Sequence, residues 1–240
     1  MQYKTQGIVL FTSRYSDTFS IAHVFTRDFG RMAYLLPKSS GKKSKIKASL
    51  FFPLSVLNME VEHLPLREIQ RLKEVEREFP LYEICTDEVK ISISFFLSEF
   101  LSKMLRETHE SKPLFDYLKQ SVHILEKAHR GLGNFHLAFM FGLTRFLGIS
   151  PNLDNYRSGA YFDLLNGIFV QQIPSHPHYL NQAQSTYLRV FCRIDYSNMH
   201  LFRMSRAERN VLIDYLLAYY RLHMYNFPPL KSLEVLRELF

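Results

Sequence analysis

The sequence changes its periodicity near residue 81, and this change restricts the folds that the chain can adopt. Before it, short segments rich in β-branched and aromatic residues alternate with turn residues, which is typical of strands. After it, apolar residues recur every three or four positions, which is typical of helices. Five short strands in such a stretch fit a small Greek-key barrel of the OB type. We therefore predict an α+β protein, with an OB-type barrel over residues 1–80 and a mainly α-helical domain over residues 81–240.

The apolar spacing and the turn residues also give approximate limits for each element. Strands are expected at residues 3–14, 18–26, 31–36, 50–61 and 67–76, the last of which could also be a short helix. Helices are expected at residues 87–107, 114–127, 134–147, 182–192 and 205–225, with a short one from residue 232. Ser205 and Glu208 form a capping-box pattern at the start of the 205–225 helix. Residues 149–181 are interrupted by Gly and Pro, which predicts an irregular insert that could hold a small hairpin.

A basic stretch lies between the third and fourth expected strands. Between Lys38 and Lys47, five lysines are spaced by Ser and Gly, and no carboxylate interrupts them. Lysines in such a loop can neutralise several phosphates and release counterions, which drives sequence-independent nucleic-acid binding. Runs of this kind are also often no more than solvated loops. The candidate contacts, to phosphates and not to bases, are Arg14, Arg27, Arg31, Lys38, Lys42, Lys43, Lys45 and Lys47.

Two aromatic residues next to this basic stretch allow two interpretations. Tyr34 and Phe51 could stack on bases, which contributes about 1–3 kcal/mol per base where it occurs. Apolar residues of strands usually face inward, however, and this favours the barrel core for both side chains.

The overall charge indicates an anionic partner. The formal net charge is +7 and the sequence pI is about 9.3, which suits a nucleic acid or an acidic peptide. Charge alone does not choose between DNA, RNA and an acidic protein. We find no signal-peptide pattern and no apolar run long enough to span a bilayer, so a cytoplasmic protein is expected.

The sequence lacks the signatures of common enzymes. It contains no GxxxxGK[ST], GxGxxG, GxSxG or HExxH motif. Its two cysteines, Cys85 and Cys192, are far apart and form neither a disulfide framework nor a cysteine-rich metal site. We therefore predict that the protein is not an enzyme and has neither a cofactor nor a metal.

Short motifs occur in a defined order along the whole chain. They are Gly7-Ile8-Val9-Leu10, Tyr15-Ser16-Asp17, Thr26 with Gly30, the lysine loop to Ser44, Leu147-Gly148 with Pro151 and Leu153, Arg209 to Leu216, and Lys231-Ser232-Leu233. Each motif is weak alone, but together they resemble the RecO family of recombination mediators and DNA-repair proteins.

The resemblance implies a function in recombinational repair. Members of this family bind single- and double-stranded DNA, anneal complementary strands and help to load RecA onto DNA coated by the single-stranded-DNA-binding protein, SSB. The expected partners are therefore DNA, RecR and the acidic, Phe-ending tail of SSB, with a functional link to RecA. A location in the cytoplasm at the nucleoid would follow.

The chain departs from the family pattern at two places. Many members carry a four-cysteine zinc site in the insert, but Asn155 and Ser158 stand at the plausible first pair, and neither is a usual zinc ligand. His176 and His178 lack further ligands in sequence, so we expect an insert held by packing. The basic residue expected early in the central helix is also missing. Substitute candidates for contacting the SSB tail or another partner are Arg145, Arg206 and Arg209.

Two alternative functions remain open from the sequence. One is a protein-interaction adaptor whose basic face binds an acidic peptide. The other is an RNA-binding module, since an OB-type barrel with a basic loop does not distinguish DNA from RNA.

Overall fold

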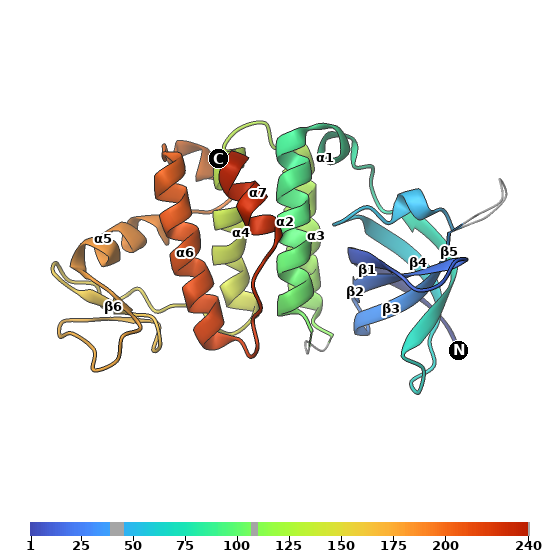
Figure 1. The fold of residues 1–240 in the computed structure, drawn as a ribbon, viewed down its shortest axis with the longest axis horizontal. Coiled ribbons are helices and arrows are strands. Elements are labelled where there is room, and N and C mark those ends of the chain that lie inside the picture. Colours follow the sequence, from blue (N-terminus) through green and yellow to red (C-terminus); the bar gives the residue numbers. More distant parts are fainter. Residues whose placement is uncertain (39–45, 107–109, 240) are drawn as a thin grey trace. The chain divides into compact units, whose positions relative to one another are not determined.

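The computed structural model describes residues 1–38, 46–106 and 110–239, and it divides into two compact units. Unit 1 comprises Met1–Lys127 and Leu230–Leu236, and unit 2 comprises Ala128–Pro229 and Arg237–Phe240. The chain therefore leaves unit 1 after the third helix and returns to it near the end of the sequence. Figure 1 shows the elements of both units and labels most of them.

Unit 1 begins with a closed five-stranded barrel, as the sequence predicts (Figure 1). Its strands are β1 (Gln2–Arg14), β2 (Phe19–Thr26), β3 (Gly30–Pro37), β4 (Val56–Glu62) and β5 (Ile69–Arg77). They pair in the order β1-β2-β3-β5-β4, and β1 closes the barrel on β4. The β3–β5 pairing is parallel and the others are antiparallel. The segment at residues 67–76, which could also have been a short helix, is therefore the strand β5. The prediction of an OB-type barrel is confirmed.

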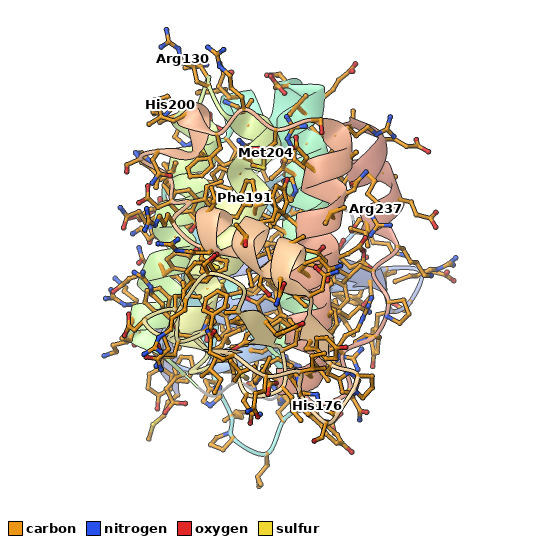
Figure 2. All side chains as sticks on the ribbon, turned by 90° about the vertical axis from the view of Figure 1, so that its left-hand side faces the viewer. Arg130, His176, Phe191, His200, Met204 and Arg237 are labelled. Carbon is orange, nitrogen blue, oxygen red and sulfur yellow. The ribbon has the colours of Figure 1, made fainter. Side chains whose placement is uncertain are left out.

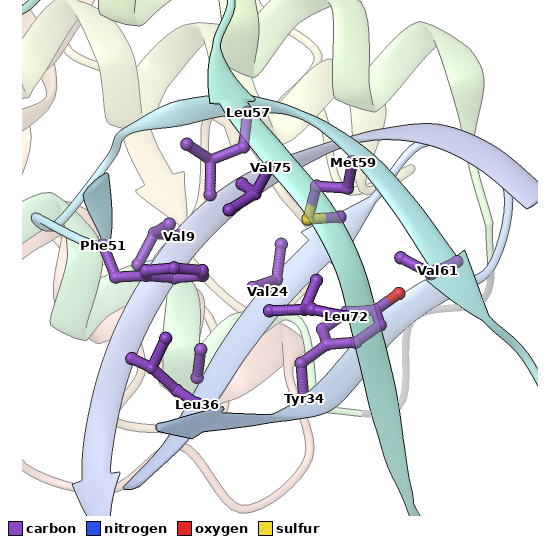
Figure 3. Packing of buried hydrophobic residues seen from close by; sticks show 11 residues of the cluster. Val9, Val24, Tyr34, Leu36, Phe51, Leu57, Met59, Val61, Leu72 and Val75 are labelled. Atoms are coloured by element: carbon purple, nitrogen blue, oxygen red, sulfur yellow. The ribbon is translucent and has the colours of Figure 1, made fainter. Parts of the chain in front are cut away.

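The barrel interior is filled by apolar side chains from all five strands and from the segment before β4. Figure 3 shows this cluster, in which Tyr34 is fully buried and Phe51 is 5% exposed. Burial also raises the pKa of Tyr34, because the phenolate form would be desolvated. Both rings therefore belong to the core, and the proposed base stacking by Tyr34 and Phe51 is wrong.

Three helices complete most of unit 1: α1 (Tyr82–Thr86), α2 (Glu88–Met104) and α3 (Lys112–Lys127). The Asp87 side chain caps α2 by accepting hydrogen bonds from the backbone N–H groups of Val89 and Lys90. One face of α2 packs on β1, and Ser98 donates a hydrogen bond from its hydroxyl to the Leu10 carbonyl. This contact attaches the helix to the barrel.

A buried polar cluster connects these three helices. The carboxylate of Glu126, on α3, accepts hydrogen bonds from the backbone N–H groups of Tyr82, Glu83 and Ile84 at 2.8, 2.9 and 3.0 Å. The ammonium group of Lys90, on α2, is fully buried and donates to the Glu126 carbonyl at 2.9 Å. The first N–H groups of a helix have no partner within that helix. Glu126 therefore supplies the acceptor that lets the short α1 form.

Unit 2 is built around α4 (Leu132–Phe146) and α6 (Arg206–His223), which pack on each other. The Tyr220 hydroxyl donates to the Met140 carbonyl at 2.7 Å, so a buried hydrogen bond also joins the two helices. The predicted capping box at Ser205 is confirmed, because its hydroxyl and the Glu208 carboxylate bond reciprocally to each other's backbone N–H groups. The last helix, α7 (Ser232–Leu239), begins in unit 1 and ends in unit 2.

The insert of unit 2 contains a small three-stranded sheet in the order β7-β6-β8. Its strands are β6 (Tyr161–Asp163), β7 (Ile168–Val170) and β8 (Tyr179–Leu180), and α5 (Gln182–Phe191) packs against β6 and β8. Phe162, Phe169 and Tyr219 are central to an apolar cluster that joins this sheet to α5 and α6. This cluster packs the sheet of the insert against α5 and α6, and the sheet contains the strand β8 in addition to the hairpin of β6 and β7.

Candidate nucleic-acid interface

The basic stretch seen in the sequence connects β3 to the short 3-10 helix η1 (Ala48–Leu50). The candidates Lys42, Lys43 and Lys45 lie outside the described residues. On either side of them, Lys38 and Lys47 are exposed. The flanking residues thus fix where the stretch leaves and rejoins the barrel: at the end where β3 finishes and β4 starts.

Two of the candidate residues lie together at this end of the barrel. The backbone N–H of Lys38 donates to the Thr18 carbonyl at 2.9 Å, and the ammonium group of Lys38 donates to the Ser16 carbonyl. The same β1–β2 turn carries Arg14, whose guanidinium lies 2.9 Å from the Asp17 carboxylate. Both partners of that ion pair are well exposed, so solvent screens it and Arg14 can exchange Asp17 for a phosphate at little cost.

A further cation of this end was missed by sequence reasoning. Arg77, the last residue of β5, donates from its guanidinium to the Ser49 carbonyl at 2.7 Å and so holds η1 against the barrel. No local motif marks Arg77, because its partner lies 28 residues earlier. We call the group formed by Arg14, Lys38, Lys47 and Arg77 the loop-end cations.

The candidates Arg27 and Arg31 lie elsewhere. Arg27 follows β2 at the opposite end of the barrel, and its guanidinium is 3.2 Å from the Asp116 carboxylate on α3. Arg31, on β3, donates to the Ser102 carbonyl on α2 at 2.9 Å and lies over the Phe11 ring at 5.8 Å. Burial, and then the charge of Arg106, lower the pKa of Arg31. The structure therefore separates these two arginines from the loop-end cations.

This separation predicts opposite effects for two arginine substitutions. Arg31→Ala should lower the free energy of unfolding by about 1–3 kcal/mol, because the buried Ser102 carbonyl loses its donor, and should leave the affinity for single-stranded DNA within twofold. Arg14→Ala should change stability by less than about 0.5 kcal/mol and weaken DNA binding about fivefold at ~0.1 M salt, the expected loss for one phosphate contact. Denaturant unfolding and fluorescence anisotropy of both variants provide the check, and a reversed pattern would contradict the assignment.

The three arginines proposed for partner contact do not form one site. Arg145 is in the last turn of α4, Arg206 donates to the Arg237 carbonyl at 2.6 Å, and Arg209 donates to the Asn134 side chain at 3.0 Å. Burial lowers the pKa of Arg209, and Asn134 in turn donates to two carbonyls that follow α5. Arg209 therefore serves at least partly to connect the starts of α4 and α6.

A polar hollow of about 560 Å³ lies beside this connection. It is lined by Gly131, Asn134, His200, Arg203 and Arg209, among other residues. Figure 2 labels His200, which lines the hollow, with Arg130 beside it and Arg237 away from both. Of the three proposed arginines, only Arg209 lines it.

The histidines of the insert contact neighbours within unit 2. The His176 ring lies 3.3 Å from the buried Asp163 carboxylate. Burial alone would raise the pKa of Asp163, but bonds from Asn166 and Leu165 and the charge of His176 outweigh it and lower that pKa. Among the described residues, no group of three or more His, Cys, Asp or Glu side chains has a metal-binding arrangement. Within the same residues, no helix is long and apolar enough to cross a membrane.

The barrel, the loop-end cations and the helical part together define a two-part α+β protein with an N-terminal OB-type barrel. Comparison with known families identifies which such protein this is. The family descriptions "Recombination protein O N terminal" and "Recombination protein O C terminal" match residues 1–79 and 85–234, respectively. The chain therefore belongs to the RecO family of DNA repair proteins.

Individual relatives match over the full length of both chains. Proteins described as "DNA repair protein RecO" are 42% identical in Azobacteroides pseudotrichonymphae and 43% identical in Phocaeicola vulgatus, each over 240 residues and 100% of both chains. A protein of the same description in Flavobacterium psychrophilum is 31% identical over 242 residues, again covering 100% of both chains. The resemblance found in the sequence motifs is thus confirmed.

Proposed function

We propose that this DNA repair protein binds DNA through the barrel, residues 1–80, and anneals complementary single strands. The observation that carries the proposal is the position of the loop-end cations, which border both ends of the lysine-rich stretch on an OB-type barrel. Cations that contact phosphates hold two strands without covering their base edges. Strands held in this way remain free to pair.

The same proposal includes the partners expected of a recombination mediator. The protein would act with RecR, bind the acidic tail of SSB and help to load RecA onto SSB-coated single strands, in the cytoplasm at the nucleoid. No step of this function needs a catalytic group, so we propose a binding protein and not an enzyme. Family membership and the basic barrel support it.

The experiment that tests this function is annealing of complementary oligonucleotides that are coated with SSB from the same organism. We expect rapid annealing of strands coated with intact SSB and at least tenfold slower annealing of strands coated with SSB that lacks its tail. Naked strands, which carry no SSB, should also anneal. Failure to anneal naked or coated strands would overturn the proposal. Faster annealing of RNA than of DNA would instead favour the RNA-binding alternative. Binding to oligonucleotides that does not depend on salt would favour the adaptor.

A further inference from the structure

The polar hollow of unit 2 gathers cations from three segments that are distant in sequence. Its volume is about 560 Å³, which is in the size range of ligand-binding sites. It is lined by the start of α4, by a segment that contains the 3-10 helix η2 (Met199–Leu201), and by the start of α6. All three belong to unit 2, whereas the loop-end cations belong to unit 1. We call this feature the α4–α6 hollow.

A buried side chain fixes one wall of the α4–α6 hollow. Asn134, which is 4% exposed, donates two hydrogen bonds, at 2.9 and 2.8 Å, to backbone carbonyls of the segment at residues 199–203. It also accepts a hydrogen bond from the Arg209 guanidinium at 3.0 Å. Gly131 lies directly against the same segment, since a Cβ atom at this glycine would come within 2.9 Å of the His200 backbone. The wall is therefore held in place by contacts within the protein.

Three arginines at the α4–α6 hollow have donor groups that are available to a ligand. Arg203 is exposed and lines the hollow, and Arg130 is exposed and directly precedes Gly131. Among the described residues, neither guanidinium has an ion-pair or hydrogen-bond partner. Arg209 uses its Nε for the bond to Asn134, so its terminal amino groups remain available as donors. Figure 2 shows Arg130 beside His200, which also lines the hollow.

Acidic residues do not cancel this charge. Among the described residues that line the hollow, none is acidic. The acidic residue next to Arg209 in sequence is Glu208, whose carboxylate accepts hydrogen bonds from the backbone N–H and the hydroxyl of Ser205 at 2.7 and 2.8 Å. These bonds and the charge of Arg209 outweigh desolvation and lower the pKa of Glu208. The carboxylate is thus engaged in the capping box of α6, and the hollow keeps a positive charge.

We propose that the α4–α6 hollow is a second nucleic-acid site, which holds the sugar-phosphate backbone of one DNA strand while the barrel holds the other. A guanidinium group binds two phosphate oxygens through parallel hydrogen bonds, which makes arginine well suited to such contacts. The lining of the hollow is mainly polar, which suits a phosphate better than the apolar anchor of a peptide. This second site rests on the proposed function, because annealing requires that two strands are held.

Two separate sites on one chain explain how a single protein molecule could pair two strands. A strand bound at each site raises the local concentration of one strand near the other, as linked binding modules do. The hollow offers three arginines, whereas the barrel has the loop-end cations and the lysine-rich stretch. We therefore expect the hollow to bind the weaker of the two strands, and to release it once base pairing starts.

The test uses the full chain and an oligothymidylate of about ten nucleotides, which is within the usual size of one single-strand site. Analytical ultracentrifugation at low salt should find two oligonucleotides bound per unaltered chain and a single one bound to Arg130→Glu/Arg203→Glu. This variant should keep the Kd of the first oligonucleotide within about twofold. It should anneal naked complementary strands at least about tenfold more slowly, because each lost phosphate contact weakens single-strand binding about fivefold at ~0.1 M salt.

A control with the same change in charge separates the hollow from a general electrostatic effect. Arg157→Glu/Arg221→Glu reverses two exposed arginines of unit 2, one in the insert and the other in the last turn of α6. Neither residue lines the hollow. This control should bind two oligonucleotides and anneal at about the unaltered rate. Both double variants should keep the denaturation midpoint, because all four side chains are exposed.

Four results would overturn the proposal. A single oligonucleotide per unaltered chain, with normal annealing, would show that the barrel acts alone, and the proposed function would stand. Unchanged stoichiometry and annealing rate in Arg130→Glu/Arg203→Glu would remove the hollow from the DNA path. Loss of binding to an aspartate-rich synthetic peptide by this variant, with both oligonucleotides still bound, would make the hollow a protein-binding site. An unaltered protein that neither binds nor anneals DNA would refute the second site together with the proposed function.

Discussion

Reversing the charges of Lys42, Lys43 and Lys45 to glutamate should weaken binding to a single-stranded oligonucleotide by about 100-fold or more at ~0.1 M salt. Each phosphate contact contributes about −0.7 to the slope of log K against log salt concentration for single strands. Losing three contacts should therefore lower the magnitude of the slope by about two. The introduced carboxylates add repulsion to this loss. Anisotropy titrations over a series of salt concentrations measure both quantities.

Two controls make this result specific. Charge reversal of Lys73, an exposed residue of β5 outside the loop-end cations, should weaken binding no more than a few-fold. The denaturation midpoint of the triple variant should match that of the unaltered protein. An affinity and a salt slope that both stay unchanged in the triple variant would show that the basic stretch is only a solvated loop.

Glu126→Ala should lower the free energy of unfolding by about 3 kcal/mol or more. Glu126 is 5% exposed, and its carboxylate accepts hydrogen bonds from three successive N–H groups of α1, which would all lose their partner. Removing the side chain also leaves a cavity. The buried ammonium group of Lys90 bonds the backbone carbonyl of residue 126 and lies 3.7 Å from the Glu83 carboxylate, and the substitution leaves both of these contacts in place. Denaturant unfolding followed by circular dichroism gives the change.

The conservative variant separates the hydrogen bonds from the shape of the side chain. Glu126→Gln keeps an acceptor oxygen and nearly the same volume but loses the charge, so its cost should be about half that of Glu126→Ala. Glu88→Ala, at an exposed position at the start of α2, should change stability by less than about 0.5 kcal/mol. A loss below about 1 kcal/mol for Glu126→Ala would contradict the importance of the buried cluster.

The strands were predictable from the sequence, and the one ambiguous segment has a physical explanation. In β5, Ile69, Leu72 and Val75 recur every third residue, which suggests a helix. The structure places a register shift in the β4–β5 pairing, where Lys73 has no partner between Leu72 and Glu74. This bulge lets Leu72 and Val75 both face the core despite their odd spacing. An irregularity set by the partner strand cannot be inferred from β5 alone.

The helix α1 shows a second limit of sequence patterns. Its five residues are too few to display apolar periodicity, and such a short helix is not stable in isolation. It forms because Glu126, 42 to 44 residues later, accepts its first N–H groups. A side chain so distant in sequence gives no local signal.

The concentration of positive charge at the candidate site was predictable from the sequence, but the arrangement of its cationic side chains in space was not. The sequence marks Arg14 and Arg31 alike as cations near a basic stretch. Only the fold shows that Arg31 donates to the Ser102 carbonyl, whereas Arg14 forms an exposed ion pair with Asp17. The groove beside α2, which Phe95 and Lys231 both line, was not predictable at all, because these two residues lie more than a hundred positions apart in the sequence.

The chain path of unit 1 has a consequence for how the protein is made. Residues 230–236 belong to unit 1 but follow unit 2 in the chain, so the ribosome delivers them after Ala128–Pro229. At about 5–20 residues per second, this intervening segment takes on the order of 5–20 s to synthesise. During that interval, the barrel and its first three helices lack Lys231 and Ser232, whose backbone N–H groups donate hydrogen bonds to the Glu99 carboxylate on α2. A nascent chain of this protein therefore completes its first compact unit only after most of its second has been translated.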